Sequence, residues 1–163
     1  MSQFENYYEY IENEARSFVD EYKSELFEEI KDGNTDVHRF VDDSRAHEWV
    51  DNDFIYADLH DCANILEQSN NIEEDFGLWE NEQPIDAIKT QAFFTYRNDL
   101  SKKVMEIIED ELENKLDELE LRLEQLKQEF KQTEDGDILE DINSDIFTIE
   151  EFADYIEEAL DRI

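Results

Sequence analysis

The sequence predicts an all-α protein, an elongated helical bundle in which one long helix carries a short coiled-coil-like seam. Apolar residues recur three and four positions apart through most of the chain, which is the period of an amphipathic helix. One proline and three glycines leave few helix breakers, and no stretch alternates with period two for long enough to require a strand. Leu, Ile, Val and Phe number 13, 15, 5 and 11 among 163 residues, which exceeds the roughly 20% typical of disordered chains. The chain is therefore expected to fold despite its charge.

The first helix is predicted from about residue 2 to residue 30, where one apolar stripe continues without a breaker. The stripe consists of Phe4, Tyr7, Ile11, Phe18, Tyr22, Leu26 and Ile30. The sequence Asp32-Gly33-Asn34 ends this helix, because glycine and asparagine favour turns over helical continuation.

Three short helices and a loop are predicted next. Thr35 is expected to cap the first of these helices, and the third ends near Ser69. Their inward residues are Val37, Phe40 and Val41, then Ala46, Trp49 and Val50, then Ile55, Leu59, Ala63 and Leu66. Residues 69–83 are polar and contain Gly77, so they are predicted to form a loop, which Phe76, Leu78 and Trp79 pin to the core.

A long helix is predicted over residues 84–131, with Pro84 in its first turn, where proline is tolerated. Its inward residues are Ile85, Ile88, Ala92, Tyr96, Leu100, Ile107 and Leu112, followed by a seam of Leu116, Leu119, Leu123, Leu126 and Phe130. The seam alternates spacings of three and four, as in a coiled coil. A helix of this length extends about 70 Å, so its distal half needs cover. Either the C-terminal helices fold back over it or a second copy of the chain covers it, and we expect a homodimer.

The expected organisation is an acidic helical body, residues 1–131, and an acidic C-terminal extension, residues 132–163, packed on it. The extension is predicted to hold a short helical piece around Ile138 to Ile146 and then a separate last helix. A capping box, Thr148-x-x-Glu151, predicts the start of that last helix. Its apolar face consists of Phe152, Tyr155, Ile156, Ala159, Leu160 and Ile163.

The net charge of −34, from 48 acidic and 14 basic residues, restricts the possible partners. Such a polyanion is not expected to bind nucleic acid or an anionic membrane directly, because Lys102-Lys103 is the only adjacent basic pair. The expected partner is a basic DNA-binding protein or complex. The N-terminus lacks an apolar signal segment, no apolar run reaches about 18 residues, and Cys62 is the single cysteine. We therefore expect a soluble, cytoplasmic protein.

The acidic residues are unevenly distributed. Residues 46–88 contain twelve Asp or Glu and no Lys or Arg, and residues 132–161 contain another twelve with no base. Carboxylates three or four positions apart on a helix lie about 5–6 Å from one another, comparable to successive phosphates of a DNA strand. The ordinary alternative is that these residues form the solvated faces of amphipathic helices. The candidate surface consists of Asp42, Asp43, Glu48, Asp51, Asp53, Asp58, Asp61, Glu67, Glu73, Glu74, Asp75, Glu80, Glu82, Glu106, Asp110, Glu113 and Asp117.

The order of several short segments resembles a known family. These segments are Asn34-Thr35-Asp36-Val37-His38, Ile55-Tyr56-Ala57-Asp58-Leu59, Ile72-Glu73-Glu74-Asp75-Phe76-Gly77-Leu78, Ile85-Asp86-Ala87-Ile88 and the acidic stretch VMEIIEDELEN. Over roughly residues 34–114, their order and composition resemble the small phage anti-restriction proteins of the Ocr (overcome classical restriction) type. The resemblance implies an all-helical dimer that mimics bent B-form DNA and occupies the DNA groove of type I restriction-modification enzymes. The host cytoplasm would then be its location. The longer N-terminal helix, the leucine seam and the acidic C-terminal helix depart from that family.

The sequence gives little support for catalysis, so we expect no enzymatic activity, no cofactor and no metal. His38, His47 and His60 form neither an HExxH motif nor a Cys/His metal spacing. The stretch from Asp141 fails as a calcium loop, because Ile146 stands at the sixth position and Phe152 at the twelfth.

Three functions therefore remain open. The first is a DNA-mimic inhibitor of a host defence enzyme, most naturally type I restriction-modification, with CRISPR or another system as the other targets. The second is a non-catalytic acidic helical scaffold or chaperone-like partner of a basic nucleic-acid-binding protein. An enzyme acting on a cationic substrate is the third. Competition with duplex DNA distinguishes the first from the second.

Overall fold

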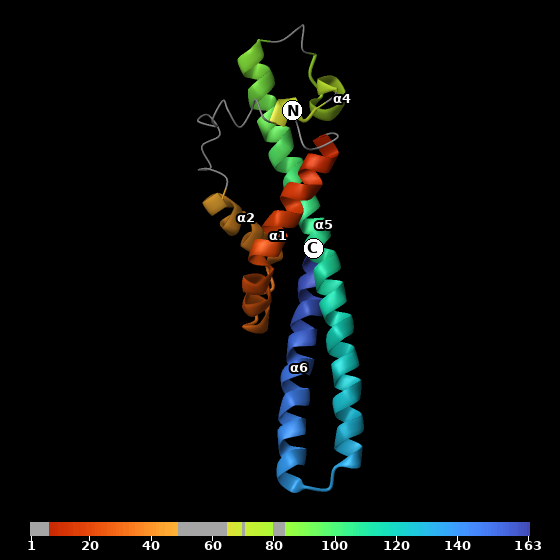
Figure 1. Ribbon diagram of the computed structural model, residues 1–163. Coiled ribbons are helices and arrows are strands. Elements are labelled where there is room, and N and C mark those ends of the chain that lie inside the picture. The colour runs from red at the N-terminus through yellow and green to blue at the C-terminus, as the bar shows by residue number, and fades with distance from the viewer. Residues whose placement is uncertain (1–6, 49–64, 70, 80–83) are drawn as a thin grey trace. The chain divides into compact units, whose positions relative to one another are not determined.

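The structure is a computed structural model that describes residues 7–48, 65–69, 71–79 and 84–163. Its labelled elements are α1 (Tyr7–Lys31), α2 (Val37–Glu48), α4 (Ile72–Phe76), α5 (Ile85–Gln132) and α6 (Gly136–Arg162) (Figure 1). No strand occurs among these residues, so the predicted all-α helical bundle is confirmed. The predicted long helix is α5, which is 48 residues long.

The chain divides into two compact units. Unit 1 comprises Met1–Glu21 and Val41–Ile107, and unit 2 comprises Tyr22–Phe40 and Ile108–Ile163. The division differs from the expected boundary after residue 131, because α1, α2 and α5 each contribute residues to both units.

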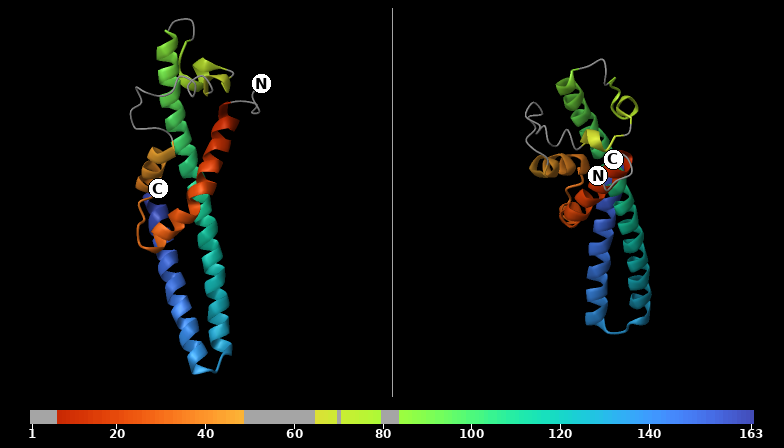
Figure 2. Two further views of the ribbon diagram at one scale, coloured as in Figure 1. Left: turned by 60° about the vertical axis from the view of Figure 1, so that its left-hand side comes forward. Right: turned by 45° about the horizontal axis from the view of Figure 1, so that its top comes forward.

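Unit 1 is built on the contact between the first part of α1 and the first part of α5 (Figure 2). Its buried residues from these helices are Tyr7, Ile11, Ala15, Phe18, Val19, Ile88, Ala92, Phe93, Tyr96, Leu100, Val104 and Ile107. Tyr7 links three elements, because its ring packs 4.8 Å from that of Phe76 on α4 and its hydroxyl donates to Asp99 on α5. The predicted inward stripe is confirmed here except at Ile85, which is 69% exposed.

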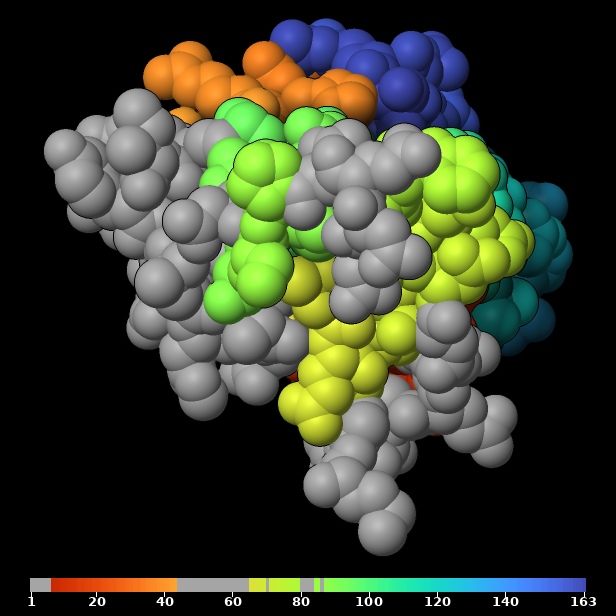
Figure 3. Space-filling view, turned by 90° about the horizontal axis from the view of Figure 1, so that it is seen from above, coloured from red at the N-terminus to blue at the C-terminus, as the bar shows by residue number. Residues whose placement is uncertain are grey.

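Residues 72–76 form the short helix α4, so the prediction of a loop through residues 69–83 is wrong there. Asn71 caps the helix by accepting a hydrogen bond from the Glu74 backbone, and Gly77 ends it with a φ of 67°, a conformation that favours glycine. Phe76 and Leu78 are buried as predicted, whereas Trp79 is 55% exposed. Residues 65–69 and 71–79 lie at the surface of unit 1 in Figure 3.

Unit 2 contains an antiparallel helical hairpin, in which α6 returns along the distal half of α5 (Figure 1). Leu119 and Leu126 of the predicted seam are buried, and Phe130 is 40% exposed. On α6 the matching spacing of three and four is kept by Leu139, Ile142, Ile146, Ile149, Ala153, Ile156, Leu160 and Ile163. Thus α6 supplies the cover that the long helix needs.

Helix α6 is continuous, so the prediction of two separate helices within residues 138–163 is wrong. Its N-cap is Asp135, whose carboxylate accepts from the backbone nitrogens of Asp137 and Ile138 at 2.9 and 3.4 Å. The Thr148 hydroxyl instead donates to the Ser144 carbonyl at 3.1 Å, one turn back in the same helix. A threonine bonded in this way lies inside a helix and does not cap one.

The turn between α1 and α2 is also capped differently from the prediction. Gly33 has a φ of 93°, as its position at the end of α1 requires. Asp36, not Thr35, is the cap of α2, since its carboxylate accepts from the Arg39 backbone at 3.1 Å. Helix α2 extends to Glu48 and so includes Ala46 of the next predicted helix. The predictions for Phe4, Trp49, Val50, Ile55, Leu59 and Ala63 lie outside the described residues.

Candidate functional site

The carboxylates of the candidate surface that are described fall in both units. Unit 1 holds Asp42, Asp43, Glu67, Glu73, Glu74, Asp75 and Glu106, and unit 2 holds Asp110, Glu113 and Asp117. All are exposed except Asp75, which is half-buried. The backbone of Glu48 ends α2, and nothing is described of its side chain. Asp51, Asp53, Asp58, Asp61, Glu80 and Glu82 lie outside the described residues.

The structure brings the acidic residues of α4 into one local group. Glu73, Glu74 and Asp75 occupy consecutive positions in its first turn, a placement that the helix dipole favours. Asp75 accepts a 2.7 Å hydrogen bond from the Ser69 hydroxyl, so this carboxylate has a structural role. Burial, the charge of Asp75 and a hydrogen bond to it raise the pKa of Tyr8, which places that phenol beside the group.

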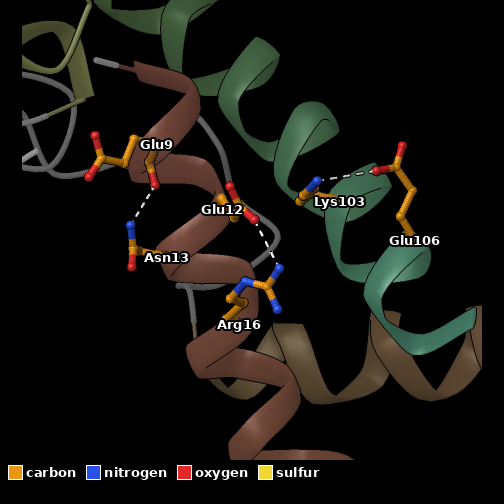
Figure 4. Close-up of polar contacts among 6 residues, drawn as sticks. All are labelled: Glu9, Glu12, Asn13, Arg16, Lys103 and Glu106. Carbon is orange, nitrogen blue, oxygen red and sulfur yellow. Dashed lines mark hydrogen bonds and ion pairs between the residues drawn. The ribbon is translucent and has the colours of Figure 1, made fainter. Parts of the chain in front are cut away.

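Along α1 and α5 in unit 1, basic side chains neutralise carboxylates of their own helix (Figure 4). Arg16 pairs with Glu12 at 2.9 Å, and Lys103 pairs with Glu106 at 3.5 Å. The hydrogen bond from Arg16, its charge and that of Lys103 lower the pKa of Glu12. Glu106 of the candidate surface is therefore a compensated charge.

The distal half of α5 in unit 2 carries both signs of charge. Residues 108–132 contain nine acidic and four basic residues. Lys115 pairs with Glu118 at 3.5 Å, and Arg122 with Glu129 at 3.8 Å. A mixture of interspersed signs is typical of a solvated helix surface. Asp110, Glu113 and Asp117 thus lie on a surface of ordinary composition.

Helix α6 differs sharply from its neighbour in the hairpin. It contains ten acidic residues, all exposed, and a single basic residue, Arg162 in its last turn. Six of these carboxylates share one outward face, opposite the apolar stripe. They are three or four residues apart, except for one longer gap between Glu140 and Glu151. We call them the α6 row, which consists of Asp137, Glu140, Glu151, Asp154, Glu158 and Asp161. The row extends about 36 Å along the helix.

Few partners within the described residues compensate the acids of α6. Tyr155 donates a 3.2 Å hydrogen bond to Glu151 of the row, which raises the pKa of that phenol. Lys127 of α5 lies 3.9 Å from Glu150, which is outside the row. The outward face of α6 therefore carries one sign of charge.

The base-free stretch 132–161, which the sequence offers as an alternative location for the surface, contains the α6 row, but the candidate residues include none of its members. The capping box at Thr148 suggested a break in the helix, and a break there separates Asp137 and Glu140 from the other four residues. With Thr148 inside a continuous helix, the two groups lie on one face. The spacing of three and four in the apolar residues from Leu139 to Ile163 is the signal that identifies this continuity.

No group of three or more His, Cys, Asp or Glu side chains is arranged to hold a metal ion in the described part of the chain. None of the described helices is both long and apolar enough to cross a membrane.

The chain matches no known protein-family model, and neither a curated protein nor a solved structure is significantly similar to it.

Proposed function

We propose that this protein is a DNA-mimic inhibitor that occupies the DNA-binding groove of a host defence enzyme and blocks DNA binding. The type I restriction-modification enzymes are the first target to test, because the sequence resembles the Ocr-type proteins. In this proposal the protein acts in the cytoplasm, has no catalytic role, and binds a basic protein rather than a nucleic acid. The expected homodimer remains a prediction. Because α6 already covers the seam of α5 within one chain, the seam itself does not call for a second copy.

One observation carries the proposal: the single-sign surface of α6. The six carboxylates of the α6 row span about 36 Å of helix axis, an average of one negative charge per about 7 Å. One strand of B-form DNA carries one phosphate per about 3.4 Å. A groove that binds a phosphate backbone would therefore meet a single sign of charge on this face, at about half the linear density of one DNA strand.

The neighbouring helix argues against a merely solvated face. The distal half of α5 lies in the same hairpin and the same unit as α6, yet it intersperses four bases with its nine acids. The exposed surface of α5 is thus solvated with both signs of charge present. An uncompensated surface increases self-repulsion and destabilises the fold, so it favours a role in binding.

The test is displacement of duplex DNA. A fluorescently labelled duplex bound to a purified type I restriction-modification enzyme is titrated with the protein, and fluorescence anisotropy reports the release of DNA. We expect complete displacement with an affinity that falls steeply as salt is added, because several ion pairs form. Binding to the enzyme without loss of DNA would contradict the proposal and favour the scaffold alternative.

A matched pair of variants assigns the surface. Asp154→Asn, Glu158→Gln and Asp161→Asn together remove three charges from the α6 row, and we expect them to weaken displacement at least about tenfold. The control, Asp110→Asn, Asp117→Asn and Glu124→Gln, removes three charges from α5 and is expected to have a smaller effect. Equal effects of the two variants would mean that α6 is not the contacting surface.

The acidic group of α4 needs a separate variant. Glu73→Lys with Glu74→Lys reverses two exposed charges and leaves Asp75 to accept the hydrogen bond from Ser69. Weaker displacement with unchanged helicity would add α4 to the inhibitory surface. Unchanged displacement would exclude it.

A further inference from the structure

We propose that the outward face of α6 docks on a cationic partner that also presents an apolar pocket, and that Phe147 is the residue that enters this pocket. The inference rests on the proposed function only in requiring a basic partner. It adds an apolar contact, which the phosphates of a DNA strand do not make.

The α6 row is interrupted at its centre by uncharged residues. Asn143, Ser144, Phe147 and Thr148 are all exposed and lie between Glu140 and Glu151, which are about three turns apart. We call these four residues the neutral window. Three of them are small and polar, so Phe147 is the only large apolar side chain of the window. The window is therefore a short apolar point between two acidic segments of one helix face.

Phe147 is unusually exposed for its type and position. Its exposed fraction is 67%, and its helix packs against α5 through a different face. Aromatic residues at the centre of a surface, surrounded by polar groups, are the typical anchors of protein interfaces. The position of Phe147 between carboxylates fits this arrangement.

Charge complementarity decides the occupant. A second copy of this chain would bring another acidic α6, or the mixed surface of a chain with net charge −34, against the row. A membrane with anionic lipids would be repelled in the same way. A basic protein groove has the opposite charge, and an apolar pocket in its floor would accept the ring, as grooves accept the apolar anchors of helical peptides.

The test uses two synthetic peptides and the full chain. Both peptides are helical and carry the same number of lysines, and one has a leucine face where the other has glutamines. Binding is measured by fluorescence anisotropy of the labelled peptides. We expect the protein to bind the leucine peptide roughly tenfold more tightly than the glutamine peptide.

Leu121 provides a matched control for Phe147. It lies on α5 in the same unit, and its exposed fraction of 63% is nearly that of Phe147. We expect Phe147→Ala to abolish the preference for the leucine peptide and Leu121→Ala to retain it. The affinity of the wild-type protein for the leucine peptide, divided by that of Phe147→Ala, should also stay constant as salt is added. Salt screens charges and does not screen apolar burial.

Three outcomes would overturn the inference: no preference in the wild-type protein, a preference that survives Phe147→Ala, or an equal loss in both variants. Circular dichroism of each variant checks that the helices remain. These measurements use no restriction enzyme, so their failure is distinct from a failure to displace DNA.

Discussion

The Arg162 guanidinium donates a 2.9 Å hydrogen bond to the hydroxyl of Thr35, and the two residues are 127 positions apart in the chain. Arg162 is the single basic residue of α6, and Thr35 is only 3% exposed. A second guanidinium nitrogen lies 3.5 Å from Asp36, the cap of α2. The contact thus connects the end of α6 to the turn between α1 and α2 within unit 2.

Replacing this arginine should destabilise unit 2. We expect Arg162→Leu to lower the free energy of unfolding by about 1–3 kcal/mol, because the buried Thr35 hydroxyl loses its partner. Most of this comes from the hydrogen bond, since the ion pair with Asp36 is half-exposed and contributes little. Urea denaturation followed by circular dichroism measures the change. In the double variant Arg162→Leu, Thr35→Val, the loss in free energy of unfolding should be smaller than the sum of the losses in the two single variants.

A basic residue without such a contact serves as the control. Lys131 lies exposed in the last turn of α5, and Lys131→Leu is expected to change the free energy of unfolding by no more than about 0.5 kcal/mol. If the two leucine variants have the same stability, the contact between Arg162 and Thr35 does not stabilise the fold.

Alkaline pH should destabilise unit 1. Burial, followed by the hydrogen bond to Asp99, raises the pKa of Tyr7, and burial raises the pKa of Tyr96. The unfolded chain releases these protons near pH 10, whereas the folded chain keeps them. Their contribution is complete below about pH 10 and is lost as pH rises further, by up to about 1.4 kcal/mol per pH unit for each tyrosine.

The measurement is urea denaturation at several pH values from about 8 to 11, with tyrosinate absorbance followed in parallel. Tyr7→Phe should reduce the slope of stability against pH above about pH 10. Tyr155→Phe is the comparison. The hydrogen bond with Glu151 is the first cause of the raised pKa of Tyr155, whereas burial is the first cause for Tyr7. A slope that Tyr7→Phe leaves unchanged would show that Tyr7 ionises as readily in the folded chain as in the unfolded one.

Two glycines should respond to alanine in opposite directions. Gly77 has a φ of 67° and nothing within 4 Å of an added methyl group, so Gly77→Ala introduces backbone strain alone, about 1–2 kcal/mol. Gly136 begins α6, also has open space, and does not have a positive φ. Gly136→Ala should therefore raise stability by about 0.5 kcal/mol. Thermal melting of both variants checks the signs, and destabilisation by Gly136→Ala would contradict the assigned start of α6.

Added salt should stabilise the protein. The charge of −34 repels itself in the folded state, and salt screens this repulsion. We expect the Tm to rise steadily between low salt and about 0.5 M sodium chloride. The variant with three charges removed from α6 should show a weaker dependence. A Tm that does not change with ionic strength would mean that self-repulsion is unimportant for this fold.

The long elements were predictable because their signals are redundant. Helices α1 and α5 each carry several apolar residues at helical spacing, so no single residue decides them. Boundaries were less predictable, since each depends on one or two side chains. Thr35 and Asp36 are both good caps by type, and only the structure shows that the Asp36 carboxylate reaches the Arg39 backbone nitrogen.

The functional surface was harder to identify than the fold. Acidic residues occur on every helix, so their presence alone selects none of them. The decisive property is the absence of nearby bases on one continuous face, which requires the correct extent of α6. The base-free stretch 132–161 is visible in the sequence, but the capping box at Thr148 predicts a break within it. The Thr148 hydroxyl instead donates to the Ser144 carbonyl and the helix continues, so its carboxylates share one face.

The crowded carboxylates of α6 also determine how binding is driven thermodynamically. A rigid line of like charges gathers a cloud of sodium or potassium ions from the surrounding solution, as DNA does. When a cationic groove covers the line, those ions return to bulk water and gain translational freedom. Association on this face is therefore expected to be entropic in origin, with little heat released in a calorimeter.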